Sequence, residues 1–183
     1  MQTSWYDGSW RDGVVELVQS VAALGGAVGW LTVPPPEDVD SWLASIASIG
    51  DARMAIATEG DRVLASGIWR RHEAEVLKRT GRVWKVMTPP DARRRGAGRA
   101  VMELLIADAR AEGIELLTLE CRGNNHGAQR MYADLGFRVT GRLPDALAIG
   151  EERFDQVLMH LDLRGGRGGL VRHGSRREGL GTT

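Results

Sequence analysis

The amino-acid sequence predicts an α/β domain built on a central sheet of mixed strand direction. The 183 residues are 43% hydrophobic and 26% charged, which is ordinary for a single globular domain with its own core. Apolar residues follow helical spacing in some segments and strand-like spacing in others. The expected order is ααβββαβαββ, in which strands first meander and then alternate with helices, and this order favours a mixed sheet.

The N-terminal half is expected to form two helices and three strands. Residues 12–26 and 36–50 carry apolar side chains at helical spacing, and a glycine lies at the end of each. Residues 52–72 contain two β-rich runs around the turn sequence EGDR, which predicts a hairpin. Residues 73–88 continue the strand pattern, with a turn expected near Thr80.

The C-terminal half is expected to alternate helices and strands before two closing strands. Residues 96–113 place small and apolar side chains on one helical face and end in glycine. Residues 114–121 form a nearly continuous apolar run, which predicts a strand covered on both faces. A further helix is expected over 125–136, followed by strands over 137–143 and 153–163.

Composition excludes several classes of protein. No apolar run approaches the roughly 20 residues that span a bilayer. The first ten residues lack the basic and apolar regions of a signal peptide, so we expect a cytoplasmic protein. Cys121 is the only cysteine, which excludes an intrachain disulfide, and the four scattered histidines do not suggest a metal site.

Charge is unevenly distributed along the chain. Residues 164–183 contain five arginines, one glutamate and many glycines, whereas the rest has 19 basic and 23 acidic residues, a formal charge of −4. Such a segment buries too little apolar surface to offset its ordering entropy. We therefore expect one domain over 1–163 and a disordered basic tail over 164–183. Two Arg-Gly-Gly copies do not predict a specific nucleic-acid partner.

Residues 91–103, DARRRGAGRAVME, place three arginines and two glycines directly before a predicted helix. Backbone N–H groups at a helix start have no intrahelical partner, and the helix dipole adds partial positive charge. Gly96 and Gly98 lack side chains, so a ligand can approach that backbone closely. The pattern indicates a phosphate or pyrophosphate site, or else a solvated basic turn. It matches neither a Walker loop nor the dinucleotide fingerprint.

The chain resembles the GNAT acyltransferases, the Gcn5-related N-acetyltransferase superfamily, over roughly residues 83–137. The family pattern Arg/Gln-x-x-Gly-x-Gly/Ala is matched by Arg93, Gly96 and Gly98, and LECRGNNHGAQRMYADLGF resembles its second conserved segment. The sequence is most similar to the tabtoxin-resistance-type and ribosomal-protein-alanine-type acetyltransferases. The resemblance implies a mainly antiparallel central sheet with one parallel, splayed strand pair and about four flanking helices. The family's first strand is not evident in residues 1–10.

The resemblance also implies a binding site for acetyl-CoA as co-substrate, and no metal. The pantetheine arm would follow the end of the strand before the glycine loop, and the pyrophosphate would lie on the loop itself. Asn125 would contact the cofactor arm, although asparagine is also a good helix N-cap. The implied cofactor-binding residues are Val86, Met87, Thr88, Arg93, Arg94, Arg95, Gly96, Ala97, Gly98, Arg99 and Asn125.

Two catalytic residues follow from the resemblance. Tyr132 matches the tyrosine that protonates the leaving thiolate of coenzyme A, although it could also serve only in core packing. Glu120 matches the general base of the alanine N-acetyltransferases, although it could equally be an ion-paired surface residue. Tyr132 follows Asn125 by seven residues, which puts both on one helical face.

Other residues could take these roles. Glu73, Glu75 and His72 are rival bases on the segment that precedes the cofactor strand. Cys121 could act as a thiol nucleophile only if a histidine such as His126 activated it. Several N-terminal tryptophans could line an acceptor pocket or simply pack in the core.

The sequence therefore predicts an N-acetyltransferase that moves an acetyl group from acetyl-CoA to a primary amine of a small molecule by direct attack. The alternative acceptor is a peptide N-terminus, as in the ribosomal-protein enzymes, and a net charge of −4 would allow an acidic groove for a basic peptide. A non-catalytic acetyl-CoA-binding module is a third reading, although such a module needs neither Glu120 nor Tyr132. No membrane partner is expected, and a homodimer stays open.

Overall fold

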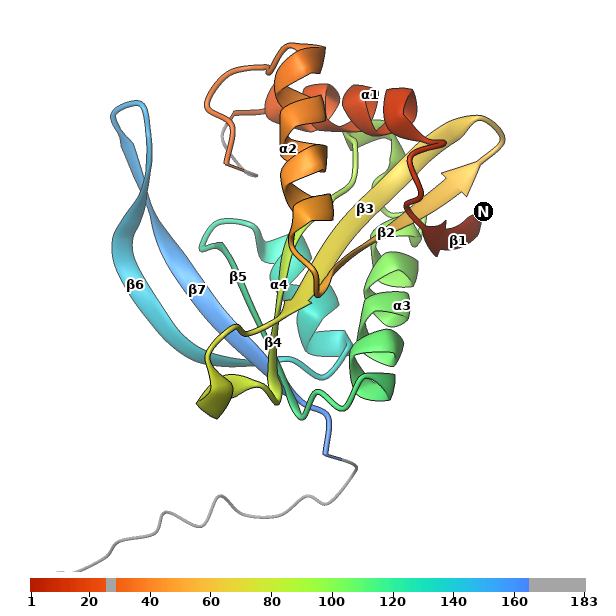
Figure 1. Ribbon diagram of the computed structural model, residues 1–183. Helices are drawn as coiled ribbons and strands as arrows, with labels where there is room; N and C mark the ends of the chain where they lie inside the picture. The colour runs from red at the N-terminus through yellow and green to blue at the C-terminus, as the bar shows by residue number, and fades with distance from the viewer. Residues whose placement is uncertain (26–28, 165–183) are drawn as a thin grey trace, which may run out of the picture.

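The computed structural model describes residues 1–25 and 29–164, and the predicted tail over 165–183 lies outside this part. The chain forms a seven-stranded sheet in the order β1-β2-β3-β4-β5-β7-β6, with helices on both faces (Figure 1). The strands are β1 Gln2–Trp5, β2 Ala52–Glu59, β3 Arg62–Arg71, β4 Thr80–Met87, β5 Leu116–Arg122, β6 Arg138–Ile149 and β7 Glu152–Asp162. The α-helices are α1 Arg11–Ala22, α2 Pro36–Ser48, α3 Ala97–Ala111 and α4 His126–Asp134, and the short 3₁₀ turns are η1 Glu75–Leu77 and η2 Pro90–Ala92.

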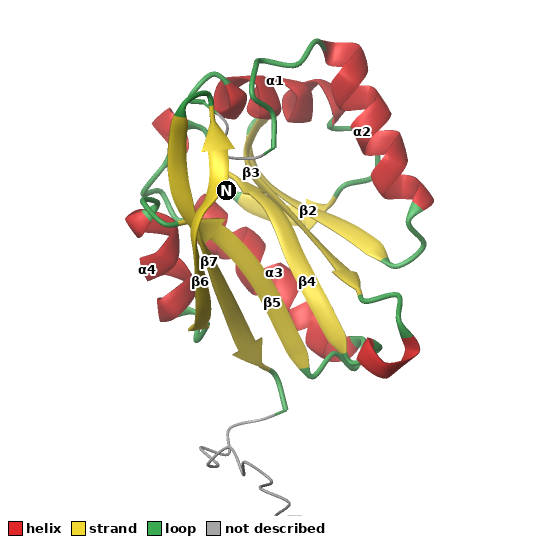
Figure 2. Ribbon diagram, turned by 90° about the vertical axis from the view of Figure 1, so that its left-hand side faces the viewer, coloured by secondary structure: helices red, strands yellow, loops and turns green. Residues whose placement is uncertain are grey.

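β4 and β5 are the only parallel neighbours among the described strands, and they separate along their length. Their pairing runs from Thr80 opposite Leu116 to Arg82 opposite Thr118. β4 then continues to Met87 without β5 as a partner, and β5 continues to its end beside β7 alone. Figure 2 shows the two strands in the middle of the sheet. The mixed sheet with one splayed parallel pair confirms the predicted fold class.

A β-bulge in β4 explains why the strands separate. Ser66 of β3 pairs with Met87, and Ile68 pairs with Trp84, so β4 has one more residue than β3 over this stretch. Lys85 lies in the bulge with a φ of 54°, which is unusual for a residue with a side chain. A bulge bends its strand and increases the local twist. The bend comes just after pairing with β5 has ended.

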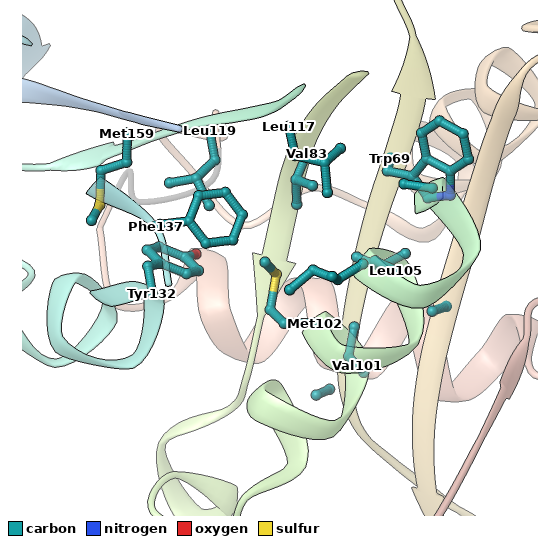
Figure 3. Packing of buried hydrophobic residues seen from close by; sticks show 14 of the residues in the cluster. Trp69, Val83, Val101, Met102, Leu105, Leu117, Leu119, Tyr132, Phe137 and Met159 are labelled. Atoms are coloured by element: carbon teal, nitrogen blue, oxygen red, sulfur yellow. The ribbon is translucent and has the colours of Figure 1, made fainter. Parts of the chain in front are cut away.

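Two apolar clusters fix the helices on the sheet. α3 and α4 cover one face, here called the α3 face, through the cluster that Figure 3 shows. α1 and α2 cover the other, the α1 face, where they pack over β2, β3 and β4. Leu117 and Leu119 of β5 are buried on the α3 face, but Glu120 is exposed on the α1 face. The prediction that both faces of this strand are covered was therefore wrong.

Three other predictions of local structure need correction. A first strand, β1, does exist and pairs antiparallel with β2, although its four residues are largely exposed and gave no apolar pattern. The turn expected near Thr80 lies earlier, at η1, and Thr80 begins β4. β6 is longer than predicted because its exposed residues continue as a hairpin with β7 as far as Ile149.

One partly buried polar contact ties α3 to the sheet. The indole Nε1 of Trp69 donates to Asp108 Oδ2 at 2.8 Å, and Arg53 donates to Oδ1 of the same carboxylate. Asp108→Ala should lower the free energy of unfolding by about 1–3 kcal/mol, because it leaves the buried indole N–H without its acceptor. Chemical denaturation measures this change. Asp108→Asn keeps an acceptor and should lose less, whereas an Ala variant as stable as wild type would contradict the assignment.

Candidate active site

The predicted pantetheine residues lie where β4 leaves β5. Val86 packs toward α3, and Met87 is buried on the α1 face. Thr88 follows the strand, and its Oγ1 would lie only 3.0 Å from a Cβ placed on Gly98. The end of β4 and the first turn of α3 are therefore in contact. The absence of a side chain at Gly98 lets them approach this closely.

The loop before α3 presents backbone N–H groups to open space. Gly96 is the N-cap of α3 with a φ of 84°, and it gives no side-chain cap to the helix. The N–H groups of the first turn, on Ala97, Gly98 and Arg99, have no intrahelical acceptor by helix geometry. A Cβ on Gly96 would meet nothing within 4 Å. The loop thus has both the donors and the free space that a pyrophosphate requires.

The arginines of this loop differ in their partners. Arg95 forms an ion pair with Glu59, and Arg99 pairs with Glu103 one turn along α3. Within the part of the chain that the structure describes, no ion pair involves Arg93 or Arg94. These two exposed guanidinium groups can therefore neutralise a phosphate without first breaking a contact.

Asn125 caps the other helix that borders the splayed strands. Its Oδ1 accepts a hydrogen bond from the backbone N–H of Ala128 at 3.2 Å, so it is the N-cap of α4. The capping role confirms one of the two interpretations of this residue. The same side chain keeps its amide nitrogen as a donor, so capping does not prevent contact with a ligand.

Tyr132 lies on the α3 face, inside the apolar cluster. Its ring is 5.9 Å from that of Phe137 between centroids, and Figure 3 shows the two side by side with the hydroxyl oxygen turned toward the middle of the cluster. Only 6% of Tyr132 is exposed. Burial, with a smaller contribution from Cys121, raises the pKa of the phenol above its usual value of 10. The hydroxyl consequently keeps its proton throughout the neutral range.

Glu120 lies on the opposite face of β5 and is held by its neighbours. Arg82 of β4 and Gln156 of β7 each donate a hydrogen bond of 2.8 Å to the same oxygen, Oε2. Among the described residues, none bonds to the other oxygen, Oε1. The carboxylate was expected at a buried strand end, but it is exposed. Its position is fixed by this three-strand network instead of by burial.

Arg82 and Gln156 were not singled out from the sequence. Their contact with Glu120 depends on the register of three strands, β4, β5 and β7, which residue patterns do not specify. The alternation of side chains along each strand could have shown that Arg82 and Gln156 lie on the same face of the sheet as Glu120. The order of strands in the sheet was needed to bring them together.

The rival bases lie away from the splayed strands. Glu73 pairs with Arg70, Glu75 pairs with Lys78, and Nδ1 of His72 accepts a bond from the backbone of Ala74. All of them precede Thr80, at the paired end of β4, whereas the strands part after Arg82. At about 3.3 Å per residue, the bulge lies roughly 17 Å further along β4 than its first residue. This placement favours Glu120 over its rivals.

Cys121 points to the α3 face, next to the cluster that contains Tyr132. Burial raises the pKa of its thiol, so the reactive thiolate is disfavoured. In the region that the structure describes, no hydrogen bond joins Cys121 to His126. The arrangement does not support a thiol nucleophile.

Two tryptophans form a feature on the α1 face that sequence reasoning left open. The rings of Trp30 and Trp42 meet edge to face at 5.2 Å, and Nζ of Lys85 lies 4.0 Å from the centroid of Trp30. Burial lowers the pKa of this lysine. The bulge therefore sends a cation against two aromatic rings that come from α2 and from the segment before it. The spacing of the tryptophans alone gave no sign of this contact.

Comparison with known proteins identifies the family. Residues 22–137 match the model of the acetyltransferase (GNAT) family, which is more than half of the chain. This chain belongs to the GNAT acetyltransferase family. Membership confirms the predicted family. No described helix is long and apolar enough to cross a membrane.

Individual relatives are more distant. The chain is 31% identical to a ribosomal protein bS18 alanine N-acetyltransferase of Escherichia coli K12 over 81 residues, which are 44% of this chain and 55% of that protein. The chain thus matches about half the length of these curated relatives. A ribosomal-protein-alanine N-acetyltransferase from Brucella melitensis superimposes with a TM-score of 0.79 at 16% identity, covering 88% of this chain and 99% of that one. A phosphinothricin acetyltransferase from Sinorhizobium meliloti, solved with acetyl-CoA, gives 0.78 at 16% identity, covering 94% of each.

Proposed function

We propose that this GNAT protein transfers an acetyl group from acetyl-CoA to a primary amine of a small molecule by direct attack. One arrangement carries the proposal. β4 and β5 separate after Arg82 and Thr118, and a carboxylate and a buried phenol lie on opposite faces of β5 beside that separation. A thioester between the strands would have a proton acceptor on one side and a proton donor on the other.

The residues present fit the donor. Its pyrophosphate would accept hydrogen bonds from the backbone of residues 94–99, where Gly96 faces open space and the helix dipole favours an anion. Its pantetheine arm would run along the edge of β4 that β5 leaves unpaired, at Val86, Met87 and Thr88. Arg93 and Arg94 would supply charge, and Asn125 would donate its amide to the arm.

The side chains on the two faces of β5 would divide the proton transfers. When bound, acetyl-CoA supplies an acetyl group activated as a thioester. Glu120 takes a proton from the acceptor's ammonium group, directly or through water, so that the nitrogen can bond to the acetyl carbon. Tyr132 gives its phenolic proton to the sulfur as the carbon–sulfur bond breaks. The nitrogen loses its second proton to solvent as the amide forms, Glu120 releases its proton to solvent, and solvent returns a proton to the phenol. The products are the acetylated amine and free coenzyme A.

Gly98→Val should abolish measurable binding of acetyl-CoA. A branched side chain there would fill the approach to the helix start and would also press on Oγ1 of Thr88. Because the second contact involves the protein itself, Tm must be measured beside the calorimetric affinity. Thr88→Ala together with Gly98→Ala is the control, since it relieves that contact and keeps the added Cβ at the loop. Wild-type affinity in a folded Gly98→Val protein would show that the loop is not the pyrophosphate site.

A protein N-terminus is the second candidate acceptor, because several relatives are ribosomal-protein-alanine acetyltransferases. A panel of small amines and of peptides with free N-termini, assayed by release of free coenzyme A, separates the two. Preferential turnover of peptides would replace the small-molecule proposal. Acetyl-CoA binding without turnover of any amine would indicate the non-catalytic module. Three expectations remain predictions: a cytoplasmic location, a homodimer, and a folded domain that ends at residue 163.

A further inference from the structure

Arg122 lies next to the proposed base on the same face of the sheet. It follows Glu120 by two residues in β5, so both side chains leave the strand on the α1 face, roughly 7 Å apart at their Cα atoms. Its register partner is Gln156, whose amide holds Glu120. On the other side of Arg122, β4 has already separated from β5. The residue therefore borders the space in which an acceptor would approach Glu120.

The guanidinium of Arg122 has no counter-ion in the described part of the chain. It stacks on the ring of Phe154 with 4.7 Å from Cζ to the centroid, and no ion pair or side-chain hydrogen bond joins it to another described residue. Its Nε is buried and lacks an acceptor. A buried N–H without a partner is destabilising, so such groups in folded proteins usually meet a ligand or water.

Arg122 adds positive charge beside arginines that are already paired with carboxylates. Arg70 is paired with Glu73, and Arg82 is paired with Glu120. Arg122 adds a cation that forms no ion pair with another described residue. A basic peptide would be repelled here, whereas an acceptor with a carboxylate would be attracted.

We propose that Arg122 binds a carboxylate of the acceptor, so that the substrate is a small amine carrying a carboxylate, such as an amino acid. This inference rests on the proposed function and names its substrate class. The ring of Phe154 packs against the face of the Arg122 guanidinium group. The N–H groups at its edge can then form a bidentate hydrogen bond with the carboxylate of the acceptor. The amine of the same molecule then reaches Oε1 of Glu120, the oxygen that Arg82 and Gln156 leave open.

The test compares the twenty protein amino acids with their α-carboxamides, using coenzyme A release to obtain kcat/KM. For the best acid, the wild type should prefer the acid over its amide by about 10- to 100-fold, as expected for a charge-assisted hydrogen bond. Arg122→Met should reduce kcat/KM for the acid by a similar factor and leave that for the amide nearly unchanged. Arg122→Lys should recover part of the preference, because lysine keeps the positive charge but cannot form the bidentate hydrogen bond.

Arg153→Met is the matched control, because Arg153 precedes Phe154 in β7 and faces the opposite side of the sheet. It should retain the wild-type preference. Equal turnover of acids and amides, a preference that survives Arg122→Met, or no turnover of any acid would each overturn the inference. If peptides or amides are acetylated in that case, only the substrate class is wrong. If every amine fails while acetyl-CoA still binds, the proposed function fails as well.

Discussion

Tyr132→Phe should lower turnover by about 10²-fold or more while leaving the protein folded and able to bind acetyl-CoA. The substitution removes only the hydroxyl, and the ring stays against Phe137 in the apolar cluster. Because burial raises the pKa of this phenol, the proton to be donated is present at every neutral pH. An alkaline decline in rate below pH 10 would therefore have to come from another group. Steady-state rates and isothermal titration with acetyl-CoA measure the two quantities.

The control for this variant is thermal stability. Tm should change little, since a ring of nearly the same shape is kept in a site where only 6% of the residue is exposed. Phe137→Leu alters the partner ring without touching the hydroxyl, so it should reduce stability more than turnover per folded molecule. A fully active, well-folded Tyr132→Phe protein would mean that Tyr132 serves only in packing.

Glu120→Gln should abolish most turnover at every pH at which the wild type is active. The amide keeps the shape of the side chain but cannot accept a proton from the acceptor. Acetyl-CoA binding should persist, because the donor site lies on the backbone of β4 and the start of α3. The measurement is kcat/KM across pH for the variant and the wild type.

Glu73→Gln and Glu75→Gln are the matched controls, since each removes a carboxylate at the paired end of β4. Both should behave nearly as wild type, because they break exposed ion pairs with Arg70 and Lys78 that contribute little. If Glu120→Gln is active and one of these variants is dead, the base lies on the segment before β4. The donor site would stand, and the assignment of Glu120 would be withdrawn.

Local patterns were enough to predict the parts of the site that a single segment makes. The helix start at Ala97 follows from glycine, arginine and apolar spacing within one stretch, and the N-cap role of Asn125 needs only the next three residues. The face of α3 that is buried was also readable from its 3.6-residue period.

Features that depend on register or on the exposure of a strand were not predictable. β5 reads as an apolar run, yet its α1 face is open because α1 and α2 lie over β2, β3 and β4. The pairing of Arg82 and Gln156 with Glu120 comes from three strands that are far apart in the chain. The bulge at Lys85 could not be predicted from a residue pattern either. A φ of 54° is more usual for glycine or asparagine, and neither residue stands at this position.

A crystal structure of the protein with acetyl-CoA tests the central claim most directly, because it shows where the thioester lies. The account predicts the pyrophosphate on the backbone of residues 94–99 and the pantetheine arm between β4 and β5. It also places the sulfur within hydrogen-bond distance of the Tyr132 hydroxyl and the acetyl carbon open toward the face that carries Glu120. A sulfur atom out of reach of Tyr132, or a cofactor bound outside the separation of the two strands, would contradict it.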